Sequence, residues 1–170
     1  MRDDRFHANS TAVKTLNTVT LDEKTVIKRS EVIETEKSIA LNDLMHDHHF
    51  VVKDYPEAQN GELKLSLSTK DNKLHFLLTS TLNDEMNKEY FISLAPFRRI
   101  VKDYFLVCEN YYEALRTNLA MVEAIDMGRR AIHNDGADTV LEMTENFLKM
   151  DHATARRLFT LICILHLKRL

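Results

Sequence analysis

The sequence predicts a single α+β domain, in which a small antiparallel β-meander of three or four strands packs against helices. Apolar residues alternate with polar ones between residues 63 and 94, which is the period of half-buried strands. From Pro96 onward they recur instead at steps of three and four, which is the period of amphipathic helices. The 170 residues include only 3 Gly and 2 Pro, and so few breakers favour long helices over many short strands.

The chain begins with a polar, unpatterned stretch. Residues 1–15 are expected to form a loose arm, and residues 16–170 the single domain. Residues 17–21 are rich in β-branched side chains and favour a short strand. Ser30 then offers an N-cap for a helix that runs to about His46.

The meander is predicted from alternation and turn chemistry. Residues 50–53 are one candidate strand, and residues 63–67 place leucines on one face of another. A turn at 71–72, Asp followed by Asn, leads into a strand over residues 74–78. Residues 90–94 continue the pattern as a third strand of the meander. A sheet this small needs a cover, which the following helix can provide.

The longest strongly periodic segment runs from Pro96 to Arg116 and predicts a core helix. Three tyrosines lie in this segment, and their hydroxyl groups need hydrogen-bond partners if the rings are buried. They are Tyr104, Tyr111 and Tyr112.

Helices fill the remainder of the chain, giving a C-terminal bundle of about four helices in addition to the N-terminal one. One is expected to end at residues 133–136, with Gly136 as its C-terminal cap. Gly128 within it indicates either a close approach of another backbone or a kink. A further helix is expected over residues 137–148. The last, from His152 to about Lys168 and capped by Asp151, is apolar around nearly all of its circumference, so it is either central or covered by a partner.

Composition excludes several classes of function. The net charge of −3 gives no global indication of nucleic-acid binding, and the scattered glycines form no phosphate loop or dinucleotide fingerprint. Cys108 and Cys163 lie in apolar helical patterns and resemble small buried hydrophobic residues rather than a disulfide framework or metal site. With no signal-peptide core and no apolar run long enough for a bilayer, we expect a cytoplasmic protein without a cofactor or membrane partner.

Several long strings resemble an alphaproteobacterial family of uncharacterised cytoplasmic proteins. They are PFRRIVKDYF with CENYYEALR, AIDMGRRAIHNDG, and TARRLFTLICILH. The resemblance covers the chain from about Leu16 to His166 and is strongest after Leu94. The chain departs from the family pattern at Ala95, where a hydroxyl cap is usual, and in the histidine run at residues 46–49. The resemblance implies no activity, cofactor or catalytic residue.

The most unusual feature is three Arg-Arg pairs, each on a predicted helix. Adjacent helical residues point about 100° apart, so each pair can direct one guanidinium inward and one outward. Guanidinium groups suit a bidentate grip on carboxylate or phosphate, and three that converge would form an anion site. The pairs are Arg98-Arg99, Arg129-Arg130 and Arg156-Arg157.

The alternative is that these arginines form internal ion pairs, because acidic residues are abundant on the same helices and buried arginines need partners. The available carboxylates are those of Asp103, Glu109, Glu113, Asp126 and Asp135.

Two histidine clusters are further candidates. His133 and Asp135 lie close to Arg129 and Arg130, and together could perform acid–base chemistry beside an anion. Alternatively, they form an ordinary helix end. The residue types at His46, His48 and His49 suit zinc, but no second ligand group has recognisable spacing, so a solvated helix end is the simpler interpretation.

These observations favour a non-enzymatic binding or regulatory protein, with an arginine-lined site for an acidic protein surface or a small phosphate-bearing molecule. One alternative is a small hydrolase or transferase that uses His133 and Asp135 with Arg129 and Arg130 on a phosphate-bearing substrate. Another is a homodimeric scaffold, in which the C-terminal helix buries its apolar face against a second copy. The acidic balance and the internal position of the aromatic residues argue against nucleic acid as a partner.

Overall fold

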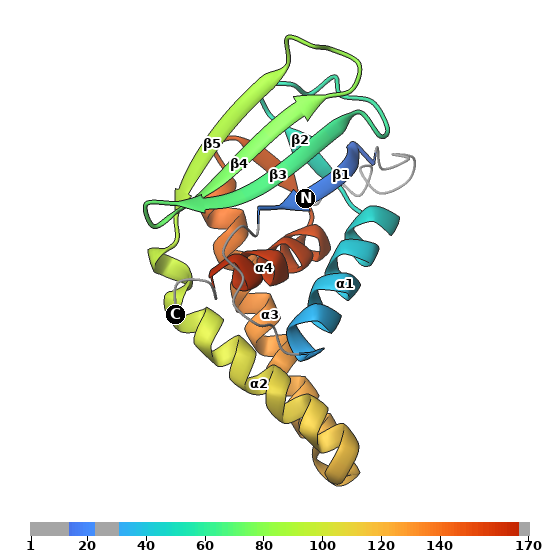
Figure 1. Cartoon of the computed structure of the whole chain (residues 1–170), viewed down its shortest axis with the longest axis vertical. Helices are drawn as coiled ribbons and strands as arrows, with labels where there is room; N and C mark the ends of the chain where they lie inside the picture. Colours follow the sequence, from blue (N-terminus) through green and yellow to red (C-terminus); the bar gives the residue numbers. More distant parts are fainter. Residues whose placement is uncertain (1–13, 23–30, 167–170) are drawn as a thin grey trace, which may run out of the picture.

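A computed structural model describes residues 14–22 and 31–166 and confirms the α+β class (Figure 1). The main sheet has the strand order β1-β3-β4-β5, and a second, two-stranded sheet pairs β2 with β6. The strands are β1 (Leu16–Leu21), β2 (Phe50–Val52), β3 (Leu63–Lys70), β4 (Lys73–Ser80), β5 (Asn87–Ser93) and β6 (Leu148–Met150). The helices are α1 (Glu31–His46), α2 (Arg98–Thr117), α3 (Val122–Thr144) and α4 (His152–His166), with short 3₁₀ turns η2 (Ala95–Phe97) and η3 (Leu119–Met121).

The predicted antiparallel meander is β3-β4-β5. Asp71 and Asn72 form the β3–β4 turn with φ of 51° and 61°, a left-handed conformation that short polar residues tolerate. The leucines and Phe76 on the inner face are buried, as the alternation predicted. The predicted short strand near the N-terminus is β1, which joins the edge of the sheet in parallel to β3. The expectation that residues 50–53 belong to the same sheet was wrong, because β2 pairs with β6.

The helices pack beneath the buried face of the sheet. In Figure 1, α4 lies below the sheet with α1 on one side and α2 on the other, and α3 runs behind α4 and packs against it. The Asp151 carboxylate accepts a hydrogen bond of 2.9 Å from the Thr154 backbone N–H, so the predicted N-cap of α4 is confirmed. Eleven of the 15 residues of α4 are buried, including Leu158, Phe159 and Cys163. The chain itself therefore covers the apolar helix that had suggested a second copy.

The predicted helix end at residues 133–136 was wrong. α3 runs without interruption to Thr144, so three helices follow the main sheet in the described chain where about four were expected. Gly136 lies in the middle of α3, where a Cβ atom would come within 2.4 Å of the Phe159 ring. A Cβ at Gly128 would meet nothing closer than Val107 Cγ2 at 3.8 Å. The close approach between helices is therefore at Gly136, and residue 148 starts a strand rather than ending a helix.

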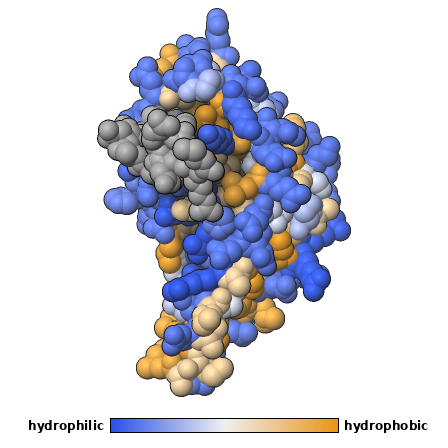
Figure 2. All heavy atoms as spheres, turned by 180° about the vertical axis from the view of Figure 1, so that it is seen from behind, coloured by the Kyte–Doolittle hydropathy of each residue, from blue (hydrophilic) through white to orange (hydrophobic). Residues whose placement is uncertain are grey.

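The free end of the α2–α3 hairpin extends beyond the rest of the domain and carries a hydrophobic surface (Figure 2). Its exposed apolar side chains include Leu115, Leu119, Met121 and Met127. Within residues 14–22 and 31–166, no helix has both the length and the apolar character that crossing a membrane requires.

The expected N-terminal arm falls mostly outside the described residues, as does the predicted cap Ser30. The first described residues, Lys14 and Thr15, are hydrogen-bonded to the rest of the domain. The Lys14 backbone N–H donates to Asn60 Oδ1 at 2.9 Å, and the buried Thr15 hydroxyl donates to the Phe50 carbonyl at 2.6 Å. Residues 167–170, at the end of the predicted C-terminal helix, also lie outside the described part.

Candidate functional site

Three helices enclose a pocket of about 450 Å³, and each presents one stripe of side chains to it. In all three helices the stripe has the same spacing, i, i+3, i+4 and i+7, which is one face of an α-helix. Tyr111 of α2 completes the lining. The stripes are Glu36, Ile39, Ala40 and Asp43 on α1; Asp126, Arg129, Arg130 and His133 on α3; and Ala153, Arg156, Arg157 and Thr160 on α4.

Two of the three predicted arginine pairs therefore meet at one pocket. Each pair occupies the two central positions of its stripe, so the strings DMGRRAIH and ATARRLFT fold into facing surfaces. Arg98 and Arg99 do not line this pocket and are exposed at the start of α2. The convergence is of four arginines from α3 and α4, rather than of one from each of three helices.

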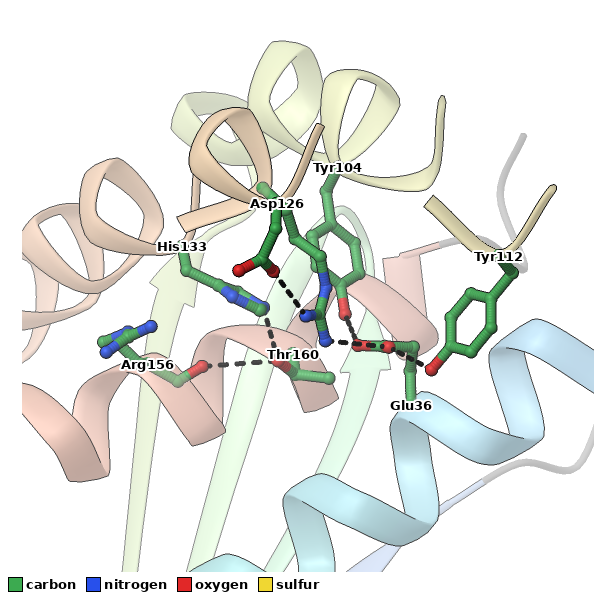
Figure 3. A network of polar contacts seen from close by, with 8 residues as sticks. Glu36, Tyr104, Tyr112, Asp126, His133, Arg156 and Thr160 are labelled. Carbon is green, nitrogen blue, oxygen red and sulfur yellow. Dashed lines mark hydrogen bonds and ion pairs between the residues drawn. The ribbon is translucent and has the colours of Figure 1, made fainter. Parts of the chain in front are cut away.

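At one end of the pocket a buried carboxylate organises the polar contacts (Figure 3). Glu36 is only 3% exposed. It accepts hydrogen bonds from the hydroxyl groups of Tyr104, at 2.5 Å, and Tyr112, at 2.8 Å. Arg129 Nη2 donates to the same carboxylate at 3.1 Å. Two of the three tyrosine hydroxyls considered in the sequence, those of Tyr104 and Tyr112, thus share one acceptor, which α1 contributes.

Burial and the adjacent Glu36 carboxylate raise the pKa of both Tyr104 and Tyr112, so these hydroxyls stay protonated and remain donors. Burial also raises the pKa of the nearby Cys108 thiol, to about 11, which keeps it in the unreactive thiol form at neutral pH. This end of the site is therefore a fixed structural network with no activated nucleophile.

The arginines of α3 are already neutralised. Asp126 contacts Arg129 Nη1 at 3.4 Å and Arg130 Nη2 at 2.9 Å. The Arg129 guanidinium also lies over the Tyr111 ring, 4.9 Å from its centroid. Internal pairing, the alternative raised by the sequence, therefore holds for these two arginines, with Glu36 and Asp126 as their partners.

The arginines of α4 have no carboxylate partner among the described residues. Arg157 Nη1 donates to the backbone carbonyl of Asp47. The Nε of Arg156 is buried and finds no hydrogen-bond acceptor within the described chain. Arg156 thus brings an unpaired positive charge and an unused donor to the wall of the pocket.

His133 lies between the two ends of the pocket. Its Nε2 is 3.4 Å from Thr160 Oγ1, and Figure 3 shows both side chains between Arg156 and the Glu36 network. Burial, together with the charges of Arg129 and Arg156, lowers the pKa of His133 to about 4, against the smaller opposing effects of Glu36 and Asp126. The imidazole is therefore uncharged at neutral pH. Asp135, its predicted catalytic partner, is exposed and does not line the pocket.

The histidines at residues 46–49 are dispersed around the end of α1. His48 is buried and structural, because its Nε2 accepts a 3.0 Å hydrogen bond from the Leu16 N–H while Nδ1 donates to the Leu44 carbonyl at 2.7 Å. Burial lowers the pKa of His48 and favours this neutral form. His46 is exposed, and the His49 backbone N–H donates to Thr154. Within the described ranges, no group of three or more His, Cys, Asp or Glu side chains could hold a metal ion.

Sequence reasoning missed Glu36, Asp43 and Thr160. An acidic residue in a helix is usually exposed, so nothing in α1 alone indicated that Glu36 is buried. The repeated spacing around the arginine pairs was the available signal for Asp126, His133 and Thr160, since all three lie on the arginine face of their helices.

Comparison with known proteins places this chain in a family. The model of an uncharacterised protein family, UPF0262, matches residues 13–168. The chain belongs to the UPF0262 family. A UPF0262 protein of Rhodospirillum rubrum is 44% identical over 149 residues, covering 87% of this chain and 89% of the relative. A UPF0262 protein of Chelativorans is 42% identical over 163 residues, covering 94% of this chain and 98% of the relative.

A third relative, from Agrobacterium fabrum, is 44% identical over 135 residues, or 79% of this chain and 83% of its own length. The source organisms are alphaproteobacteria, as the resemblance implied. No solved structure matches the fold. Since the UPF0262 family is uncharacterised, membership assigns no activity, and function has to be argued from the pocket.

Proposed function

We propose that this UPF0262 protein is a non-enzymatic cytoplasmic binding protein whose pocket holds a small molecule through a phosphate or carboxylate group. The observation that carries the proposal is Arg156, an arginine on the pocket wall with no carboxylate partner and a buried Nε with no acceptor in the described chain. An oxyanion in the pocket would neutralise this uncompensated charge. The two free, buried cysteines suit the reducing conditions of the cytoplasm.

Neighbouring groups support an anion at this position. Arg157 lies beside Arg156, and within the described ranges its Nη1 donates to a backbone carbonyl rather than to a carboxylate, so its charge is not neutralised there. His133 is neutral, so its ring can donate or accept without adding a charge. The volume of about 450 Å³ is that of a small-molecule site, which favours a metabolite over a protein segment.

Binding is favoured over the hydrolase or transferase alternative. A general base works best when its pKa lies near the working pH, and the pKa of about 4 leaves His133 a weak base at neutral pH. The exposed Asp135 is not placed to orient the imidazole from within the pocket. The pocket thus combines strong anion recognition with weak proton-transfer chemistry.

The test is calorimetric titration with ethyl phosphate at low ionic strength, on wild type, Arg156→Gln and Arg98→Gln. Arg98 is exposed outside the pocket, so its variant removes the same charge without touching the site. We expect saturable binding by wild type and Arg98→Gln, and at least tenfold weaker binding by Arg156→Gln, since hydrogen bonds to charged groups contribute about 1.5–3 kcal/mol. Absence of saturable binding by wild type, or equal weakening in both variants, would overturn the proposal.

A further inference from the structure

The pocket also carries an uncommitted negative charge, contributed by α1. Asp43 lines the pocket, and its carboxylate makes no ion pair or side-chain hydrogen bond within the described chain. The other two acids of the lining, Glu36 and Asp126, are occupied by arginine. Asp43 on α1 and Arg156 on α4 are therefore two pocket residues of opposite charge that form no ion pair within the described chain.

The two unpaired charges belong to helices that pack against each other. α1 contacts α4, and Arg157 Nη1 reaches the carbonyl of Asp47, one helical turn beyond Asp43. Arg157 is thus directed towards the end of α1 that carries the Asp43 carboxylate. The α1 and α4 stripes also contribute the apolar side chains of Ile39, Ala40 and Ala153 to the lining.

The charge balance of the whole lining limits what can bind. Four arginines against three carboxylates leave one excess positive charge when His133 is neutral. A polyphosphate with three or four negative charges would be poorly neutralised there and would be repelled by Asp43. A ligand that carries one anionic group and one amine suits both walls.

We propose that the natural ligand class is a small zwitterion, with its phosphate or carboxylate bound by Arg156 and its ammonium group bound by Asp43. This inference rests on the proposed function, because it assumes that the anion binds at Arg156. It adds the second recognition point and excludes nucleoside triphosphates as ligands. The apolar side chains of Ile39, Ala40 and Ala153 would contact the carbon chain that joins the two charged groups.

The test compares two probes that differ by one amine, O-phosphoethanolamine and ethyl phosphate, by calorimetric titration of the full chain at low ionic strength. We expect O-phosphoethanolamine to bind wild type about fivefold more tightly, which is the scale of a solvent-accessible charge pair. Asp43→Asn should reduce this ratio to about one while leaving the affinity for ethyl phosphate unchanged or slightly higher. Asp47→Asn, an equal charge change one turn away and outside the lining, should keep the ratio.

The outcomes separate the two proposals. Equal binding of both probes to wild type, or an unchanged ratio in Asp43→Asn, overturns the zwitterion while leaving an anion site at Arg156. Binding of neither probe overturns both proposals. Because Asp43 is exposed and unpaired, its substitution should not unfold the chain, and unchanged thermal stability of Asp43→Asn would verify this.

Discussion

The Glu36 network gives the strongest stability prediction. Glu36→Gln keeps the size of the side chain but removes the buried negative charge that faces Tyr104, Tyr112 and Arg129. Glu36 is the side chain through which α1 hydrogen-bonds to both α2 and α3 at this point of the domain. Loss of the charge should therefore weaken the attachment of α1 to the hairpin.

The magnitude follows from the contacts. Breaking a buried ion pair by removing one partner costs about 3–5 kcal/mol. The Gln side chain keeps one acceptor oxygen, and Arg129 keeps its contact with Asp126, so part of the network survives. We expect Glu36→Gln to lower the free energy of unfolding by about 2–3 kcal/mol, equivalent to a fall in Tm of roughly 4–12 °C for a domain of this size.

The assay is equilibrium unfolding in urea, monitored by far-UV circular dichroism, with Glu109→Gln as control. Glu109 is exposed on α2 and outside the pocket lining, so its variant should stay within about 0.5 kcal/mol of wild type. A Glu36→Gln variant as stable as this control would refute the claim that the buried carboxylate ties the helices together.

Three further predictions follow from single positions. Gly136→Ala should lower the free energy of unfolding by about 1–3 kcal/mol or more, because its Cβ would overlap the Phe159 ring. Gly128→Ala should leave the free energy of unfolding unchanged or raise it by up to about 1 kcal/mol. Thermal unfolding of both variants checks this, and equal effects would contradict it. Between pH 6.5 and about 4 the folded chain holds fewer protons at His133 than the unfolded chain does, so acidification destabilises the fold. As the pH is lowered through this range, the free energy of unfolding should therefore decrease less steeply in His133→Asn than in wild type. Parallel pH profiles of the two proteins would contradict the burial of a neutral imidazole. Asn72 has a φ of 61°, which glycine adopts readily and valine does not. Asn72→Gly should therefore stabilise the β3–β4 turn by about 0.5 kcal/mol, and Asn72→Val should destabilise it by about 1 kcal/mol or more. The opposite order of Tm values would refute the turn assignment.

Local patterns in the sequence predicted most of the fold. Alternating leucines identified β3 and β4, and the helical stripe from Pro96 identified α2. The Asp-Asn turn and the Asp151 cap were readable because each depends on side chains within a few residues. Such features are encoded by short-range chemistry.

The errors arose where distant parts of the chain decide the local structure. The run from His133 to Gly136 resembles a helix end, but packing of Gly136 against Phe159 carries α3 through it. The pairing of β2 with β6 joins segments about a hundred residues apart and has no local signature.

The candidate site was predictable in part. The arginine pairs indicated an anion site, and two of them line the pocket. The pairing of Arg129 and Arg130 with Asp126 is local to α3, and the sequence offered that carboxylate as a partner. The pairing of Arg129 with Glu36 could not be read from the sequence, because Glu36 lies on a helix far away in the chain. The exposed position of Arg98 and Arg99 likewise depends on which face of α2 packs inward.

The central claim is that the unpaired guanidinium of Arg156 binds an oxyanion. Its most direct test is a titration with inorganic phosphate followed through the Nε–Hε signals of the arginines in ¹H–¹⁵N spectra. We predict a saturable shift of the Arg156 signal with no comparable shift of the Arg98 signal. An Arg156 signal that stays unmoved, or that drifts without saturation together with Arg98, would contradict the account.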